Sequence, residues 1–92
     1  MNLAERFGEN LKRARNRAGL SQEELAVRAS LHRTEIGLVE RGERSVLLET
    51  AIKLAGAAGV PLAELVAGIE WSPGFSERGR FEAAEGSGEE GG

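Results

Sequence analysis

The sequence predicts an all-α fold, a compact bundle of five short helices followed by a short C-terminal arm. Three observations support this fold class. Apolar residues up to position 67 recur at spacings of three and four, as on one face of a helix. Capping residues and glycines mark the ends of these stretches. No segment alternates apolar and polar residues convincingly over the length of a strand.

The first two helices show clear sequence boundaries. The first covers residues 3–18, ends at Gly19, and carries the apolar stripe Leu3, Phe7, Leu11, Ala14 and Ala18. Ser21 and Glu24 then form a capping box that opens the second helix. Leu20 can pack onto Leu25 across its first turn, and the inward residues are Leu25, Ala26 and Ala29.

The remaining three helices are shorter. After a tight turn at Ser30 and Leu31, a third helix begins at His32, its N-cap, and stops at Gly42. A fourth covers residues 48–58, with Leu47 at its cap position, Ser45 as a substitute cap, and a buried side of Leu48, Ala51, Ile52, Leu54 and Ala55. Pro61 suits the first turn of a fifth helix that ends at Val66 or Ala67.

Composition narrows the class of protein. The 92 residues, 40% of them hydrophobic, fill one small core and leave little for an enzyme cleft. Cysteine is absent, which excludes disulfides and thiolate sites, and His32 is the only histidine. No signal peptide or membrane span is recognisable. We expect a soluble cytoplasmic protein with no catalytic residues, metal site, cofactor or membrane contact.

The charge is unevenly distributed along the chain. Residues 1–69 hold ten Lys and Arg against nine Asp and Glu, a net charge of +1. Residues 70–92 hold two Arg against six Glu, a net charge of −4. We therefore expect a domain at 1–69, an arm at 70–82, and a disordered, acidic, Gly-rich tail at 83–92. A near-neutral domain can still carry a locally basic face for nucleic acid.

The second and third helices, joined by a tight turn, match the helix-turn-helix arrangement. At about 100° per residue, one arc of the third helix holds Arg33, Thr34, Gly37, Leu38 and Arg41. Ile36 and Val39 lie opposite and can anchor the helix. The alternative is a generic helical bundle in which this outward face is merely solvated.

Three segments in fixed order carry a family resemblance: residues 19–26 (GLSQEELA), 31–36 (LHRTEI) and 40–42 (ERG). With them the chain resembles the lambda-repressor-like (Xre/Cro) family over about residues 3–69. The resemblance implies a lambda-repressor-like bundle that regulates transcription by binding double-stranded DNA. It places a recognition helix, from about residue 32 to residue 41, in the major groove of a palindromic or pseudopalindromic operator.

The resemblance also assigns roles to single residues. Arg33 and Thr34 read bases, since Arg can grip guanine and Thr can contact a thymine methyl. Leu38 either meets a thymine methyl or is simply exposed, and Gly37 allows close backbone approach. Phosphate contacts are expected from Gln22, Ser21, His32, Arg41 and Arg44. The alternatives are an ordinary exposed helix position for Gln22, a capping role without a phosphate contact for His32, and merely solvated side chains for the two arginines.

Other family positions are structural. Arg15 and Glu40 match a pair that forms an ion pair between the first and third helices. Glu35 either supports its own helix start or accepts a hydrogen bond from cytosine. Ser30 stands where the family usually has glycine, at a turn position that favours positive φ.

We expect a homodimer, because one recognition helix reads only a few base pairs. The arm residues Ile69, Trp71, Phe75 and Phe81 either join the dimer interface or fold back on their own bundle. Short extended segments at 69–71 and 80–82 can pair within or between chains. The alternative function is a protein-interaction module, such as an antitoxin partner or adaptor. A regulatory protein partner is compatible with this size, whereas a small-molecule effector is not expected.

Overall fold

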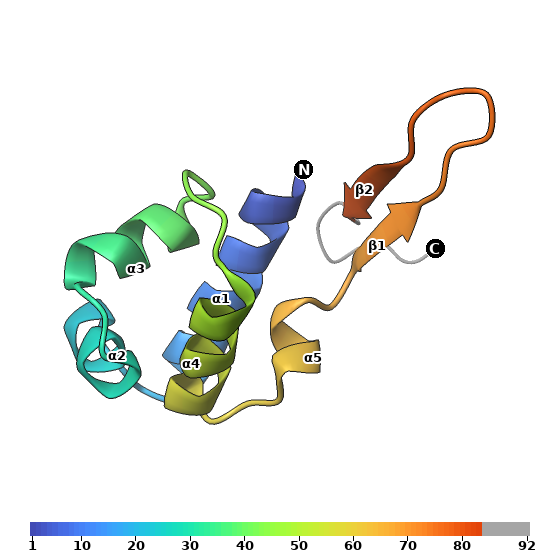
Figure 1. The fold of residues 1–92 in the computed structure, drawn as a ribbon. Coiled ribbons are helices and arrows are strands. Elements are labelled where there is room, and N and C mark those ends of the chain that lie inside the picture. The colour runs from blue at the N-terminus through green and yellow to red at the C-terminus, as the bar shows by residue number, and fades with distance from the viewer. Residues whose placement is uncertain (84–92) are drawn as a thin grey trace.

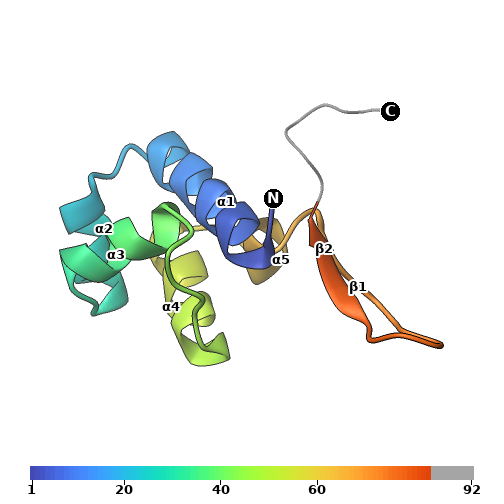
Figure 2. The same ribbon diagram turned by 90° about the horizontal axis from the view of Figure 1, so that it is seen from above.

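The computed structural model describes residues 1–83, which form five helices and one hairpin. The elements are α1 (Leu3–Arg17), α2 (Gln22–Ala29), α3 (Arg33–Glu40), α4 (Leu48–Ala58), α5 (Leu62–Leu65), β1 (Ile69–Ser72) and β2 (Arg80–Ala83). The helices surround one core, with α2 and α3 at one end and α5 at the other, and the hairpin projects away from the bundle (Figure 1). Figure 2, from above, shows the same outward course of the hairpin, whose base contacts α1.

The hairpin corrects the all-α prediction. β1 and β2 pair antiparallel in one chain, with Trp71 opposite Phe81 and Ile69 opposite Ala83. Each strand is only four residues long, too short for alternation to be visible in the sequence. The two segments that the sequence allows to pair, residues 69–71 and 80–82, do so within the chain. Ala83, predicted to open the tail, lies in β2, and the rest of that predicted tail lies outside the described residues.

The core combines residues from all five helices. Its largest fully buried side chains are Leu11, Leu25, Ile36, Leu54, Leu65 and Val39. Three residues predicted to be buried are instead exposed: Ala18, Leu48 and Ile52. Ala18 caps the end of α1. The buried face of α4 is made mainly of alanines, and Leu48 and Ile52 flank that contact rather than entering it.

The capping of the helix N-termini agrees only in part with the predictions from the sequence. The Ser21–Glu24 capping box opens α2 as predicted, and a second box that the sequence analysis missed joins Asn2 and Glu5 at α1. His32 and Leu47 occupy the N-cap positions of α3 and α4, yet neither makes a side-chain cap hydrogen bond. The predicted fifth helix is shorter than expected, with Pro61 as its N-cap rather than inside its first turn.

Two residues of α1 fix neighbouring elements and were not predicted. A Cβ on Gly8 would lie 2.2 Å from the carbonyl oxygen of Val39, so only glycine lets α3 approach α1 this closely. The side-chain amide of Asn10, which is buried, donates to the carbonyls of Leu65 and Ala67, both at 3.0 Å. These bonds satisfy carbonyls at the end of α5 and fix the point from which the hairpin leaves.

Candidate nucleic-acid interface

α2 and α3 form two short helices joined by a tight three-residue turn. The backbone N–H of Leu31 donates to the carbonyl of Ala26 at 2.9 Å, which closes the end of α2. Ser30 adopts φ +57°, and it is the only non-glycine residue among positions 1–83 with positive φ. Ile36 and Val39 are buried and hold α3 against the core, leaving its opposite side outward.

The outward side of α3 brings together most of the predicted base-reading residues. Arg33 and Thr34 are exposed in its first turn, and Leu38 is half-buried one turn later. The core holds the opposite side of this helix, so an exposed arginine and threonine in its first turn can reach the edges of bases in a groove.

Gly37 does not belong to this exposed set. The structure buries it, and a Cβ built there would lie 3.1 Å from Nη1 of Arg41. The Arg41 side chain therefore lies back over Gly37, which the ideal helix angle could not show. Its lack of a side chain makes room for Arg41 in this conformation, and the close approach of its backbone to DNA stays a prediction.

Of the residues predicted to contact phosphate, three are exposed around α3, and two at the start of α2 already bond to glutamates. Arg41 and Arg44 are exposed beyond the end of α3, and Nε of Arg41 lies 3.1 Å from a carboxylate oxygen of Glu43. His32 is exposed before α3. Ser21 already serves its capping box, since its N–H donates to Glu24 at 2.8 Å and its oxygen accepts from Glu24 N–H at 3.0 Å. Its hydroxyl proton is the donor that this arrangement leaves for a phosphate.

Gln22, the first residue of α2, is linked to the end of α3. Its Nε2 donates to Oε1 of Glu40 at 3.0 Å, and the side chain is half-buried. Glu40 also accepts two hydrogen bonds from Arg15, from Nε at 2.6 Å and from Nη2 at 3.0 Å. The Arg15–Glu40 ion pair implied by the resemblance is thus present, and Gln22 is an additional member that the sequence analysis had not linked to it.

This ion pair is almost entirely shielded from water. The exposed fractions of the two side chains are 11% for Arg15 and 3% for Glu40. Arg15 Nη1 also donates to the carbonyl of Leu20 at 2.9 Å, which ties the α1–α2 connection to the same cluster. The hydrogen bonds to Glu40 raise the pKa of Arg15 further above its ordinary value, despite the opposing effect of burial. The cluster therefore holds α1, α2 and α3 in one fixed arrangement.

Comparison with protein families decides what this arrangement is. The family model described as helix-turn-helix (HTH_3) matches residues 11–65, which include α2, the turn and α3. This chain belongs to that helix-turn-helix family. The match covers the Arg15–Glu40 cluster and the outward face of α3, and it ends before the hairpin.

Named relatives of this helix-turn-helix protein are regulators. The chain is 47% identical over 66 residues to control protein C.SmaI of Serratia marcescens, covering 72% of this chain and 79% of that protein. It is 39% identical over 61 residues to control protein C.BamHI of Bacillus amyloliquefaciens, covering 65% of this chain and 75% of that protein.

A solved structure supports the same relationship. The crystal structure of the restriction-modification controller protein C.AhdI from Aeromonas hydrophila is similar with a TM-score of 0.66 and 44% identity, covering 67% of this chain and 94% of that one. The helix-turn-helix protein described here is accordingly a DNA-binding transcriptional regulator. These relatives are named as control or controller proteins.

Two further findings concern residues 1–83 alone. Within that range no cluster of three or more His, Cys, Asp or Glu side chains is arranged to hold a metal ion. In the same range no helix has both the length and the apolar content to cross a membrane.

Proposed function

We propose that this protein is a sequence-specific regulator that places α3 in the major groove of a palindromic or pseudopalindromic operator. The observation that carries this proposal is the exposed start of α3, where Arg33 and Thr34 project from a helix that Ile36 and Val39 anchor in the core. A rigid helix with an arginine at its first turn suits bidentate recognition of guanine. Leu38, half-buried on the same side, suits contact with a thymine methyl group.

Residues around this face hold the DNA backbone. Gln22 begins α2, where unsatisfied backbone N–H groups favour a phosphate. Arg41 and Arg44 extend the positive charge past the end of α3, and the Ser21 hydroxyl and His32 lie at the starts of α2 and α3. Phosphate contacts fix the register of α3 in the groove and carry little sequence information themselves.

Dimerisation and cellular role form part of the same proposal. A homodimer places two copies of α3 on half-sites about 34–36 Å apart, which gives a longer recognition sequence. Similarity to two control proteins and to a restriction-modification controller protein supports control of restriction-modification genes. Such a regulator works in the cytoplasm, at the nucleoid when it is bound to DNA.

The decisive experiment is selection of bound duplexes from a random library with the full chain, followed by footprinting and gel shifts at several salt concentrations. We expect an inverted repeat whose half-site centres are separated by one helical turn, and an affinity that falls steeply with salt. Enrichment of no sequence, together with binding too weak to shift DNA at low salt, would indicate the protein-interaction module instead. Enrichment of a single half-site would contradict the dimeric operator alone.

A further inference from the structure

Two apolar surfaces of this chain remain exposed among residues 1–83. One is a pocket between the N-terminal half of α1, the loop before α4, and α5. The other is the hairpin of β1, β2 and their connection, residues 69–83, called here the arm. The family match ends at residue 65, before the arm begins.

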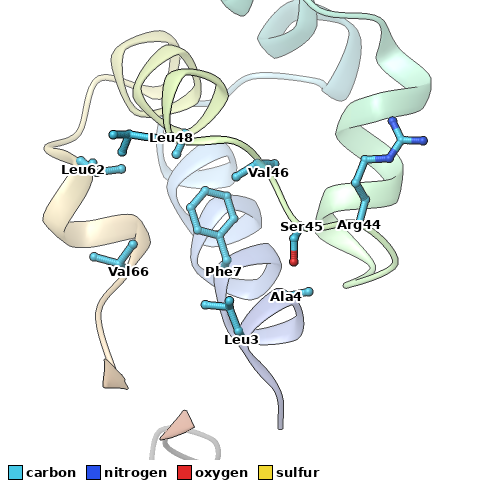
Figure 3. A pocket seen from close by; sticks show the side chains of 10 residues that line it. Leu3, Ala4, Phe7, Arg44, Ser45, Val46, Leu48, Leu62 and Val66 are labelled. Carbon is cyan, nitrogen blue, oxygen red and sulfur yellow. The ribbon is translucent and has the colours of Figure 1, made fainter. Parts of the chain in front are cut away.

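The pocket is open and almost entirely apolar (Figure 3). Its volume is about 280 Å³, and its walls come from Leu3, Ala4, Phe7, Val46, Leu48, Ala51, Leu62 and Val66, with Arg44 and Ser45 at one side. The Phe7 ring lies among these side chains, and the charged end of Arg44 points away from them (Figure 3). A cavity of about 150 Å³ already admits a benzene ring, so this pocket has room for an aromatic side chain.

The arm carries aromatic side chains that are costly to leave in water. The strand register places Trp71 and Phe81 opposite each other on one face, and their rings meet edge to face at 5.2 Å and 75°. Trp71 remains 56% exposed and Phe81 55% exposed, while Phe75, in the connection between the strands, is 100% exposed. A two-stranded hairpin is marginal in water by itself, and an exposed aromatic patch of this kind marks an interaction surface.

The base of the arm is fixed so that its tip points away from its own bundle. Asn10 binds the carbonyls of Leu65 and Ala67, and Ile69 packs against the core. From Gly68 the strands run outward, and both ribbon views show the connection between them as the part of the arm farthest from the helices (Figures 1 and 2). The exposed aromatic tip and the pocket of one chain therefore do not meet.

We propose that each arm of the homodimer docks in the pocket of the partner copy, with Phe75 as the anchor that enters the pocket. Trp71 and Phe81 then cover the exposed pocket rim at Leu48 and Val66. This inference rests on the proposed homodimer and adds to it the site at which the arm binds. The contact is reciprocal, so a two-fold axis satisfies both arms and both pockets and closes the assembly at two copies.

The area that this exchange buries suits a stable dimer. An aromatic side chain buries about 150–250 Å², and the arm offers one that is fully exposed and two that are about half exposed. The aromatic side chains of the two arms together supply about 600–1,000 Å², and the surfaces that cover them add to this area toward the roughly 1,200–2,000 Å² of a standard interface. A single arm on an unrelated protein would bury only half of this.

Disulfide trapping tests the docking directly, because the chain has no cysteine of its own. Ser76→Cys marks the residue after Phe75, and Ser45→Cys marks the side of the pocket; both changes are nearly isosteric at exposed positions. After the two full-length variants are mixed and mildly oxidised, we expect a disulfide heterodimer as the main product. Ala18→Cys, exposed at the far end of α1, is the matched partner that should not cross-link to Ser76→Cys.

The same variants distinguish the other possible outcomes. A third variant carries both Ser45→Cys and Ser76→Cys in one chain. If this variant closes into a monomeric disulfide while mixing the single variants gives no heterodimer, the arm folds back and the docking proposal is overturned. If sedimentation shows a dimer but mixing gives no cross-link, the dimer stands and the arm site is wrong. A monomer at micromolar concentration, even on DNA, overturns both.

A point variant measures the contribution of the anchor. Phe75→Ala removes a side chain that is fully exposed in the single chain, so the fold should be unchanged. We expect the dimer dissociation constant to rise at least about tenfold, as for a buried aromatic anchor. Ser76→Ala is the control and should leave that constant unchanged. Fluorescence of Trp71, the only tryptophan, should shift to the blue as wild-type protein dimerises, and an unchanged spectrum across the dimer transition argues against the site.

Discussion

Gln22 donates its side-chain amide to Glu40 at 3.0 Å, and the accepting oxygen is the one that Arg15 Nη2 also reaches at 3.0 Å. The residue expected to touch phosphate is therefore oriented by a buried carboxylate, which is itself held by an arginine of α1. The same cluster therefore stabilises the fold and positions a residue that is expected to bind DNA. A change at Arg15 should thus act on DNA binding without any contact between Arg15 and DNA.

Arg15→Ala should destabilise the protein by about 3–5 kcal/mol, because it leaves the Glu40 carboxylate buried without its cation. Chemical denaturation measures this loss. The double variant Arg15→Leu with Glu40→Met is the control, since replacing both partners by apolar residues is often neutral. We expect it to recover most of the stability while DNA affinity stays low, because Gln22 then lacks its acceptor. Full affinity in the stable double variant would show that Glu40 does not orient Gln22.

Gly8→Ala should destabilise the bundle by roughly 1–3 kcal/mol or more, as overpacking does. The added Cβ would lie 2.2 Å from the Val39 carbonyl and 2.8 Å from that of Glu40, and backbone cannot move aside cheaply. Gly56→Ala in α4 is the matched control, because a Cβ there meets nothing within 4 Å. Helix propensity predicts that this control gains up to about 1 kcal/mol. Thermal unfolding of both variants checks the opposite signs, and equal effects would contradict the close approach of α1 and α3.

The sequence predicts interactions between residues close in the chain better than contacts between distant ones. The capping box of Ser21 and Glu24 lies within one helical turn, so the sequence motif alone is enough to predict it. Gly8 and Asn10 act across long sequence separations: the amide of Asn10 reaches a carbonyl 55 residues away. Periodicity marks which face of a helix is buried but carries no information about the atom that it meets.

The sequence predicted which side of α3 faces outward, but not the packing of every residue on that side. Helical geometry correctly leaves Arg33 and Thr34 exposed, because their backbone positions alone decide that. It does not show that Gly37 is buried, with the guanidinium of Arg41 one turn later lying close to it. The hairpin was missed as a fold element because its strands are only four residues long, and the contact between Trp71 and Phe81 joins residues ten positions apart.

Ser30→Gly should stabilise the protein by about 1 kcal/mol, because a non-glycine residue in the left-handed region costs roughly 1–2 kcal/mol. Ser30 ends α2 with φ +57° and ψ +46°. Gly59→Ala supplies the reverse change at the end of α4, where φ is +74° and the space around the Cβ is open. It should lose about 1 kcal/mol for conformational reasons alone. Denaturant midpoints measure both changes. A loss of stability in Ser30→Gly would mean that the serine side chain stabilises the turn by more than its left-handed backbone costs.

The pH dependence of stability should include a contribution from Glu24. Hydrogen bonds from Ser21 lower the pKa of this carboxyl below its ordinary value. A carboxyl whose folded pKa is depressed contributes stability above its unfolded pKa, near 4.3, and loses it as the pH falls through the folded value. Glu24→Gln removes the titration, so its stability difference from wild type should shrink as the pH falls below about 5. Glu23→Gln controls for net charge, and a constant difference for Glu24→Gln across that range argues against the capping carboxylate.

Arg33→Ala and Arg41→Ala should weaken DNA binding in different ways. Arg33 is exposed in the first turn of α3, so its loss should cost about 1–3 kcal/mol per operator contact and relax the preference at one base pair of each half-site. Arg41 lies past the end of α3, so its loss should weaken all sequences alike and lower the salt slope by about 1 per contact. Gln22→Ala should also act on all sequences, with little change in slope because the amide is uncharged. Binding isotherms on operator and scrambled duplexes at several salt concentrations separate the effects. If Arg33→Ala left sequence preference intact while Arg41→Ala altered it, the two roles would have to be exchanged.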